Sequence, residues 1–309
     1  MSDRRSGGLP GRPDGRPRIG LVLGAGGTAG EAFHRGVVRA MDDLGVDARA
    51  AEVIVGTSAG ALVAAWLRRS APARPPSAAP RTGRPARSRQ GLLLDLARRP
   101  RQGLNALLLR PEFTTGRLDV SFIAERLRRL HGTAWPAPEL WIVAVRRRDG
   151  RRVVFGRPGA PVTDVGSAVA ASCAIPAYFA PTRIDGVDYL DGGVHSPTNA
   201  DLLAGRDLDL VVISAPMSAD VRSVRPRVDL PIRLRFRQLL RGETWTLHRH
   251  GLRIVTIEPD TATLQAMGLN MMSARRIEEV EARAYRHARR PRRRLQAAAH
   301  TGRPAEPAP

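Results

Sequence analysis

The pentapeptide Gly56-Thr57-Ser58-Ala59-Gly60 has the pattern G-x-S-x-G, which is typical of a serine nucleophile. It follows the apolar residues 53–55 and precedes a helical run, so Ser58 is expected in a sharp turn between a strand and a helix. Such a turn leaves no room for Cβ atoms beside the serine, which explains the two glycines. The helix N-terminus favours the alkoxide and then the acyl-enzyme. We therefore predict a nucleophile, although an ordinary Gly/Ser/Ala turn is the alternative that this motif alone leaves open.

A second turn, rich in glycine, comes earlier in the chain. The apolar residues 19–23 lead into Gly24-Ala25-Gly26-Gly27-Thr28-Ala29-Gly30, and a helical pattern follows. Glycines in this position expose backbone N–H groups and direct them, with the helix N-terminus, at negative charge. One suitable ligand is the oxyanion of a tetrahedral acyl intermediate. The other is a dinucleotide pyrophosphate, because Gly24-x-Gly26-x-x-Ala29 fits the looser fingerprint and Asp47 or Glu52 follows about 20 residues later.

A serine nucleophile also needs a proton acceptor. The usual α/β-hydrolase order is Ser…Asp…His, but His248 and His250 lie in an arginine-rich stretch, and the serine motif comes too early for that fold. Asp191 ends a predicted strand and is followed by Gly192 and Gly193, which permit close approach to another turn. A pKa moderately raised by burial would let this carboxylate accept the serine proton. We predict Asp191 as the base, with a plain Asp-Gly-Gly turn as the alternative.

The elements that must position these turns alternate between strand and helix. Residues 19–23 and 53–55 are predicted as buried strands, and residues 31–44 and 59–69 as the helices that follow them. This alternation indicates parallel pairing and an α/β sheet. Further helices are predicted at 121–130, 165–171 and 274–288, strands at 140–146, 153–155, 208–214 and 253–257, and a hairpin around Asp185-Gly186.

Composition outlines the domain. The chain has 309 residues, 42% of them hydrophobic, which is enough for one large α/β domain. Residues 1–18 and 290–309 are rich in Arg, Gly, Pro and Ala and are predicted as disordered tails. Residues 70–91 have no hydrophobic face and form a Pro/Arg-rich insertion. Residues 19–289, with this insertion, are therefore predicted to form a single domain.

The net charge of +21 comes from arginine alone, because the chain contains no lysine. Such a charge could serve to bind nucleic acid or anionic lipid. It could also reflect composition bias, because abundant Arg, Ala, Gly and Pro together indicate a GC-rich genome. Only 4% of residues are aromatic and no nucleic-acid-binding signature is present, so we expect no specific nucleic-acid partner. Residues 92–109 combine leucines with Arg98, Arg99 and Arg101, which predicts peripheral contact with anionic membranes. An ordinary helix packed on the sheet is the alternative.

The single cysteine, Cys173, excludes a disulfide framework and a Cys-rich metal site. The basic N-terminus runs into Gly and Pro instead of the apolar segment of a signal peptide. No stretch approaches the ~18 apolar residues that span a bilayer. We therefore expect a cytoplasmic protein whose membrane contact, where it occurs, is peripheral at the inner surface.

The three motifs together resemble those of the patatin-like phospholipase family. Two stretches look especially like bacterial members: Ala171-Ser172-Cys173-Ala174-Ile175-Pro176, and residues 191–200 with Asp191-Gly192-Gly193-Val194 and Ser196-Pro197-Thr198-Asn199-Ala200. The resemblance covers about residues 19–288. It implies a three-layer α/β/α fold with a central, mostly parallel sheet.

The resemblance also implies a function: hydrolysis of acyl esters of lipids or phospholipids through a Ser–Asp dyad and an acyl-enzyme, with no metal and no cofactor. By position, Ser58 is the nucleophile, Asp191 is the base, and the amides of Gly26, Gly27 and Thr28 form the oxyanion hole. The glycines that support the motifs are Gly24, Gly30, Gly56, Gly60, Gly192 and Gly193. One position departs from the pattern, because Ala29 stands where many members carry Arg or Lys, and Arg35 could replace that charge only indirectly.

Two functions of other classes stay open at this point. One is an NAD(P)-binding oxidoreductase that uses the first turn, which cofactor absorbance in the purified protein would favour. The other is a non-catalytic basic protein that binds membrane surfaces or nucleic acid. Turnover of a short-chain p-nitrophenyl ester would count against both.

Overall fold

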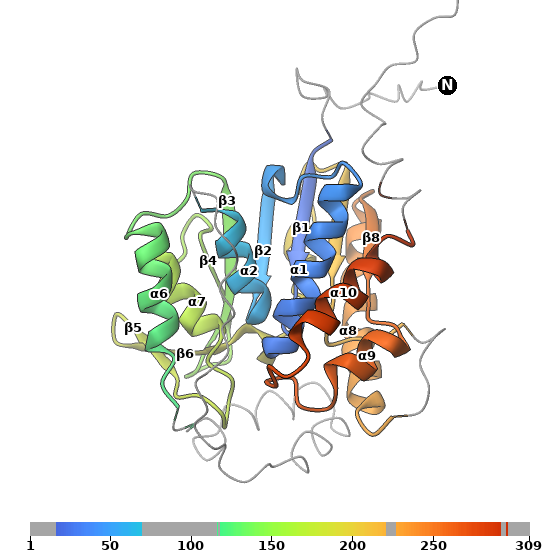
Figure 1. The fold of residues 1–309 in the computed structure, drawn as a ribbon. Coiled ribbons are helices and arrows are strands. Elements are labelled where there is room, and N and C mark those ends of the chain that lie inside the picture. The colour runs from blue at the N-terminus through green and yellow to red at the C-terminus, as the bar shows by residue number, and fades with distance from the viewer. Residues whose placement is uncertain (1–16, 70–115, 117, 221–226, 292–294, 296–309) are drawn as a thin grey trace, which may run out of the picture.

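A mixed sheet of eight strands forms the centre of the computed structural model (Figure 1). The structure describes residues 17–69, 116, 118–220, 227–291 and 295. The strand order is β5-β6-β3-β2-β1-β7-β8, with β4 also paired to β3. The strands are β1 (Ile19–Leu23), β2 (Val53–Thr57), β3 (Glu139–Arg146), β4 (Arg152–Phe155), β5 (Thr182–Ile184), β6 (Val187–Asp191), β7 (Leu210–Ser214) and β8 (Arg253–Ile257). Strands β3, β2, β1, β7 and β8 are parallel, whereas β4, β5 and β6 join by antiparallel pairs.

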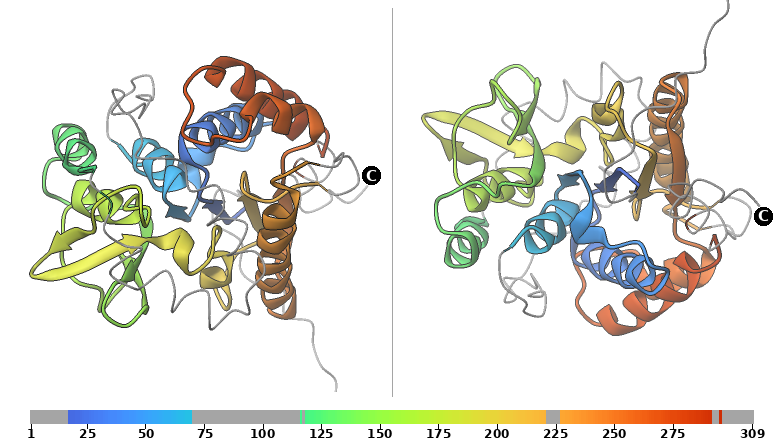
Figure 2. Two further views of the ribbon diagram at one scale, coloured as in Figure 1. Left: turned by 90° about the horizontal axis from the view of Figure 1, so that it is seen from below. Right: turned by 90° about the horizontal axis from the view of Figure 1, so that it is seen from above.

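Helices cover both faces of this sheet (Figure 2). They are α1 (Gly27–Asp43), α2 (Ala59–Leu67), α6 (Ser121–His131), α7 (Val165–Ser172), α8 (Leu230–Arg249), α9 (Thr261–Met267) and α10 (Ile277–Ala288), with 3₁₀ turns η1 (Ala48–Ala50), η2 (Gly192–Val194) and η3 (Ala200–Leu203). Alternate strand residues point to opposite faces. Leu21 and Leu23 therefore belong to the core beneath α1, α2 and α7, while Val22 belongs to the core on the other face, together with Leu240 of α8. In the described part of the chain, no helix combines the length and apolarity needed to cross a membrane.

The predicted fold class, a mostly parallel sheet between layers of helices, is confirmed. The Asp185-Gly186 hairpin is present, with both residues at positive φ. Helix α1 begins at Gly27 and not at residue 31, so the end of the glycine-rich segment is helical. The predicted tails, the insertion at 70–91 and the predicted membrane segment at 92–109 lie outside the described residues, apart from Pro17, Arg18, Arg290, Pro291 and Leu295.

Helices α8 and α9 were not predicted from the sequence. The buried residues of α8 are Arg233, Leu240, Glu243 and Leu247, so two of its four inward positions are charged. An apolar stripe at helical spacing is the signal by which such a helix is found. Here the charges interrupt it.

The pairing of β3 brings two strand ends together. β2 pairs with β3 up to Thr57↔Val143, and β6 pairs with β3 from Ala144↔Asp191 onward. β4 pairs with residues on both sides of this junction, so it occupies the opposite edge of β3. β2 and β6 therefore share one edge and approach it from opposite directions. Their carboxyl ends meet head to head, which places Asp191 beside the residue that follows Thr57.

Candidate active site

Ser58 lies between β2 and α2 in a turn that we call the serine turn (residues 56–60). Its backbone has φ 53° and ψ −119°, and the residue is only 3% exposed. A non-glycine residue at positive φ is strained unless its surroundings hold it. A Cβ on Gly60 would lie 1.9 Å from the Leu23 carbonyl oxygen, and one on Gly56 would lie 2.6 Å from Ala61 Cα. Both glycines are therefore required by close backbone approach.

The backbone of Ser58 is held by Ser172, the last residue of α7. The Ser58 amide donates to Ser172 Oγ over 2.9 Å, and that hydroxyl donates to the Val143 carbonyl over 2.6 Å. Ser172 is completely buried. It therefore links the strained serine to β3, a role that local sequence patterns do not reveal, although Ser172 lies within the stretch that carries the family resemblance.

Ser172→Ala is expected to lower both stability and turnover. The change leaves the Ser58 amide and the Val143 carbonyl without this partner, and each unsatisfied buried group costs about 1–3 kcal/mol. A looser Ser58 should lower kcat more than it raises KM. Chemical denaturation and ester hydrolysis of the variant would measure both effects. Ser121→Ala, at the exposed start of α6, is the control that should change neither.

Asp191 ends β6 and is 4% exposed. Its carboxyl is hydrogen-bonded to the Ser58 hydroxyl, and its Oδ1 accepts the Gly193 amide over 2.7 Å. Burial raises the pKa of Asp191 to about 7, and the bonds from Ser58 and Gly193 offset only part of that rise. A Cβ on Gly192 would lie 2.3 Å from the Val143 carbonyl oxygen, so glycine permits this approach. The structure thus brings the two predicted residues, Ser58 and Asp191, into direct contact.

Asn199 ties the loop after Asp191 to the strand before Ser58. It is fully buried in the left-handed region at φ 55°. Its Nδ2 donates to Thr57 Oγ1 over 3.2 Å and to the Ser196 carbonyl over 2.6 Å. In the sequence, Asn199 stands out only as part of the stretch that carries the family resemblance, and no role was predicted for it.

The glycine turn (residues 24–30) lies against both other motifs. The Gly60 amide donates to the Gly24 carbonyl over 3.1 Å, and a Cβ on Gly193 would lie 3.4 Å from that of Ala25. The amides of Gly24, Ala25, Ala29 and Gly30 all have backbone acceptors. Among the described residues, no acceptor is found for the amides of Gly26, Gly27 and Thr28. These three N–H groups are therefore available to a ligand.

Close packing explains the glycines of this turn. A Cβ on Gly26 would lie 2.6 Å from Gly30 Cα and 2.7 Å from the Pro216 ring. Gly27 has φ 58°, and a Cβ there would meet the Met271 carbonyl oxygen and Met272 Sδ at 2.9 Å. The chain between α9 and α10 thus covers the first turn of α1.

The dinucleotide interpretation does not fit this geometry. Asp47 and Glu52 precede β2, at the amino ends of the parallel strands, and Asp47 caps η1 by accepting the Arg49 amide. The glycine turn follows β1, at the carboxyl ends, where open α/β sheets bind ligands. Neither acid is therefore placed to reach a ribose bound there. Within the described residues, no group of three His, Cys, Asp or Glu side chains is arranged to hold a metal ion.

The histidines considered as bases lie away from Ser58 or face solvent. His248 and His250 are exposed at the end of α8, just before β8 begins. Because β8 is parallel to β2 across the sheet, this is the edge opposite the serine turn. His195, directly after η2, is exposed.

The charge that Ala29 lacks is not supplied by Arg35. Arg35 pairs with Glu31 over 2.8 Å and with Glu281 over 3.0 Å, which directs it toward α10. Instead, Arg275 and Arg276 line a pocket of about 200 Å³ that also reaches Ala29. These two arginines, which sequence patterns did not single out, bring positive charge to the first turn of α1.

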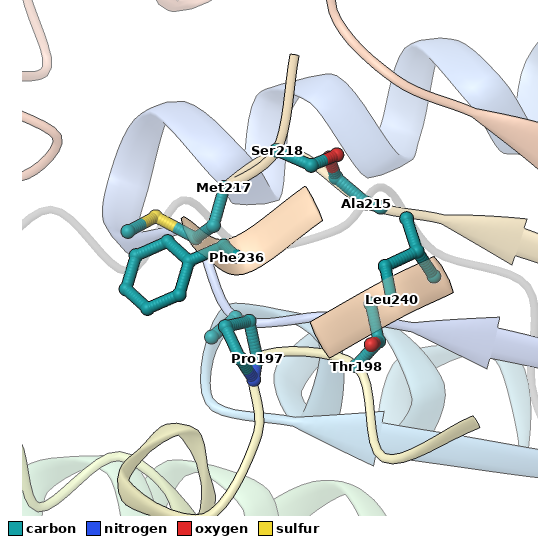
Figure 3. A pocket seen from close by; sticks show the side chains of 8 residues that line it. Pro197, Thr198, Ala215, Met217, Ser218, Phe236 and Leu240 are labelled. Carbon is teal, nitrogen blue, oxygen red and sulfur yellow. The ribbon is translucent and has the colours of Figure 1, made fainter. Parts of the chain in front are cut away.

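A second, narrow pocket lies beside Ala25 (Figure 3). Its labelled side chains come from the loops around Pro197 and Met217 and from Phe236 and Leu240 of α8. The hydroxyls at its wall are already bonded, Thr198 to Glu243 and Ser218 to the Ala215 carbonyl. The pocket is therefore largely apolar.

Comparison with known proteins identifies relatives of this chain. The family model described as patatin-like phospholipase matches residues 21–204. Uncharacterized NTE family proteins of Mycobacterium tuberculosis and Mycobacterium bovis are 28% identical over 225 residues, which cover 70% of this chain and 55% of theirs. The chain thus spans about half the length of these curated relatives.

Solved structures with overall similarity include VipD from Legionella pneumophila, with a TM-score of 0.42 and 13% identity over 92% of this chain and 67% of that chain. Human GIVD cytosolic phospholipase A2, in complex with methyl gamma-linolenyl fluorophosphonate and terbium chloride, gives a TM-score of 0.42 and 13% identity over 94% of this chain and 60% of that one.

Proposed function

Because this chain belongs to the patatin-like phospholipase family, we propose that it is a serine acyl-ester hydrolase acting on lipids or phospholipids. The observation that carries the proposal is the hydrogen bond between the Ser58 hydroxyl and the buried Asp191 carboxyl. The three amides of the glycine turn that have no acceptor among the described residues would supply the remaining part that acyl transfer requires. We assign residues 19–289 to this hydrolase.

In the proposed reaction, the Asp191 carboxylate accepts the Ser58 proton while Ser58 Oγ attacks the ester carbonyl carbon. The amides of Gly26, Gly27 and Thr28 donate to the oxyanion of the tetrahedral intermediate. The intermediate collapses, and Asp191 returns the proton to the departing alcohol. Water then attacks the acyl carbon while Asp191 accepts its proton. Collapse of this second intermediate breaks the bond between the acyl carbon and Ser58 Oγ, Asp191 returns the proton to Ser58 Oγ, and the carboxylic acid leaves. Each step uses the same carboxyl group, and none needs an imidazole.

A lipid substrate is supported by the family and by the pocket that reaches Ala29. Its lining combines the apolar Met267, Leu269 and Ile277 with Arg275 and Arg276. Apolar side chains suit an acyl chain, and arginine suits an anionic headgroup. Peripheral contact with an anionic membrane is part of this proposal.

The direct test is hydrolysis by the wild-type protein. We expect turnover of p-nitrophenyl butyrate and release of fatty acid from phosphatidylcholine or lysophosphatidylcholine. The absence of turnover on all three would contradict the proposal. Cofactor absorbance in the purified protein, without esterase activity, would favour the oxidoreductase alternative.

The pH dependence of this activity is a further prediction. Only the ionised form of Asp191 accepts a proton, and its pKa is about 7. We therefore expect kcat/KM to rise about tenfold per pH unit below that value and to level off above about pH 8. Rates measured on p-nitrophenyl butyrate from pH 5 to 9 would show this. A plateau that already begins near pH 5 would contradict a buried carboxyl base.

A further inference from the structure

His34, on α1, is completely buried behind the glycine turn. Its Nε2 lies 2.7 Å from the Gly24 carbonyl oxygen, and its Nδ1 lies 2.8 Å from Ser214 Oγ. A carbonyl oxygen can only accept, so Nε2 carries the proton. In the neutral ring Nδ1 then accepts from the Ser214 hydroxyl. Both ring nitrogens are thus occupied, and neither is free to exchange a proton with a substrate.

The Gly24 peptide joins the glycine turn to the serine turn. Its carbonyl accepts both the His34 ring and the Gly60 amide, and its amide donates to the Ser214 carbonyl over 3.0 Å. The next amide, of Ala25, donates to the Pro197 carbonyl over 2.7 Å. The amides without an acceptor in the described part of the chain begin immediately afterwards, at Gly26. The orientation of Gly24 therefore sets where those amides point.

We propose that His34 is a positioning residue that fixes the Gly24 carbonyl and thereby aligns the amides of residues 26–28 with Ser58. The inference rests on the proposed function of these amides as the oxyanion hole. His34 acts through Gly24 and takes no part in proton transfer. A displacement of about 1 Å at a reacting centre lowers the rate about 10²-fold, so a modest rotation of Gly24 has a large effect.

The electrostatics agree with this geometry. Burial lowers the pKa of His34 to about 4, although its bond to Gly24 partly offsets this. The ring therefore stays neutral at the pH where Asp191 is ionised. A neutral Nε2–H donor is the form that the Gly24 carbonyl needs.

The activity test compares three variants on p-nitrophenyl butyrate. His34→Leu removes both bonds and should lower kcat by about 10–100-fold, with little change in KM. The rate of fluorophosphonate labelling at Ser58 should fall in parallel. His34→Gln, whose amide can donate to the Gly24 carbonyl, should recover a substantial part of kcat. Val37→Ala, which removes apolar volume from the same buried helix, is the control that should lower stability and leave kcat unchanged.

The pH profile separates positioning from base catalysis. The apparent pKa of kcat/KM should stay at the wild-type value in His34→Gln and His34→Leu. Wild-type kcat in folded His34→Leu would overturn the proposal, and so would loss of the inflection near pH 7. If His34→Leu does not fold, Ser214→Ala provides the milder test, because it frees only Nδ1, and should lower kcat less than tenfold.

A measurement on the wild-type protein does not depend on turnover. ¹⁵N NMR should show His34 as the neutral Nε2–H tautomer from pH 5 to 8, with a slowly exchanging ring proton. An Nδ1–H tautomer, or titration near pH 6.5, would overturn the proposal even if the protein hydrolyses esters. If the proposed function is wrong, the wild-type protein and every variant should show no ester turnover, while the NMR spectrum still shows the expected His34 tautomer. That result would also remove any role of His34 in positioning.

Discussion

Ser58→Ala is expected to lower kcat on acyl esters by at least about 10⁴-fold, because the variant has no oxygen to form the acyl-enzyme. The loss should come without unfolding, since alanine keeps the β-carbon that the turn already accommodates. Reaction of the wild type with a fluorophosphonate probe should label the peptide that contains residues 56–60. The variant should not be labelled. Wild-type turnover by Ser58→Ala would place the activity at another site.

A second variant, Ser58→Gly, tests whether the backbone of Ser58 is strained. Ser58 has φ 53°, and such strain in a non-glycine residue costs about 1–3 kcal/mol. Glycine relieves it, although glycine's greater freedom in the unfolded chain offsets part of the gain. We therefore expect Ser58→Gly to be inactive yet more stable than Ser58→Ala, by about 1 kcal/mol in denaturant unfolding. A Ser58→Gly variant less stable than Ser58→Ala would contradict a strained serine turn.

Much of the candidate site could be predicted because its parts are local. Residues 56–60 and 24–30 are short turns that each link a strand to a helix, although some of the atoms that require their glycines are distant in the sequence, such as Leu23 for Gly60 and Met271 for Gly27. Each could be predicted from a short pattern between an apolar run and a helix. The pairing of Ser58 with Asp191 was predicted from the Asp-Gly-Gly motif and from the resemblance, but the geometry of their contact could not be, because it depends on how β6 and β2 share one edge of β3.

The residues that were missed act through distant partners. Ser172 is 114 residues from Ser58, Asn199 is 142 from Thr57, and His34 is 180 from Ser214. No spacing rule connects such pairs. Each is a small or polar residue that looks like ordinary core or loop in the sequence, and only the fold shows which group it bonds.

Helix α8 was missed for a related physical reason. Its buried Glu243 accepts from Thr198 and from the Ala200 amide, and its buried Arg233 donates to the carbonyls of Pro216 and Ser218. Charged groups are rarely buried unless they are paired or bonded in this way. The helix thus uses charge to hold the two loops behind the glycine turn, and a hydrophobic pattern cannot reveal that.

Asp191→Asn should lower kcat about 10³- to 10⁴-fold, because an amide fills the same volume but cannot accept the Ser58 proton. His195→Ala, His248→Ala and His250→Ala should each keep most of the activity. Collapse of activity in His248→Ala or His250→Ala, with Asp191→Asn still active, would point to a Ser–His–Asp triad.

The same substitution should raise stability, and the effect should grow with pH. An aspartate in the unfolded chain loses its proton near pH 3.8, whereas Asp191 in the folded protein keeps its proton up to about pH 7. Between these values the folded state binds more protons, so its stability falls as pH rises, by up to about 4 kcal/mol above pH 7. Asparagine does not titrate and avoids this loss. Asp191→Asn should therefore unfold at a higher denaturant concentration than the wild type at pH 8, and the difference should shrink toward pH 4.

Asp229→Asn is the matched control, because its expected effect on stability at pH 8 is opposite to that of Asp191→Asn. Burial alone would raise the pKa of Asp229, but hydrogen bonds and charge from Arg227 and Arg233 outweigh it and lower that pKa. Its ionised form therefore stabilises the folded protein above the usual aspartate pKa, and Asp229→Asn should lower stability at pH 8. The two carboxyl groups thus have opposite expected effects on stability: ionised Asp191, buried beside Ser58, lowers it, whereas ionised Asp229, paired with Arg227 and Arg233, raises it. An Asp191→Asn protein that keeps its turnover, or that is less stable than the wild type at pH 8, would show that Asp191 is an ordinary structural carboxylate.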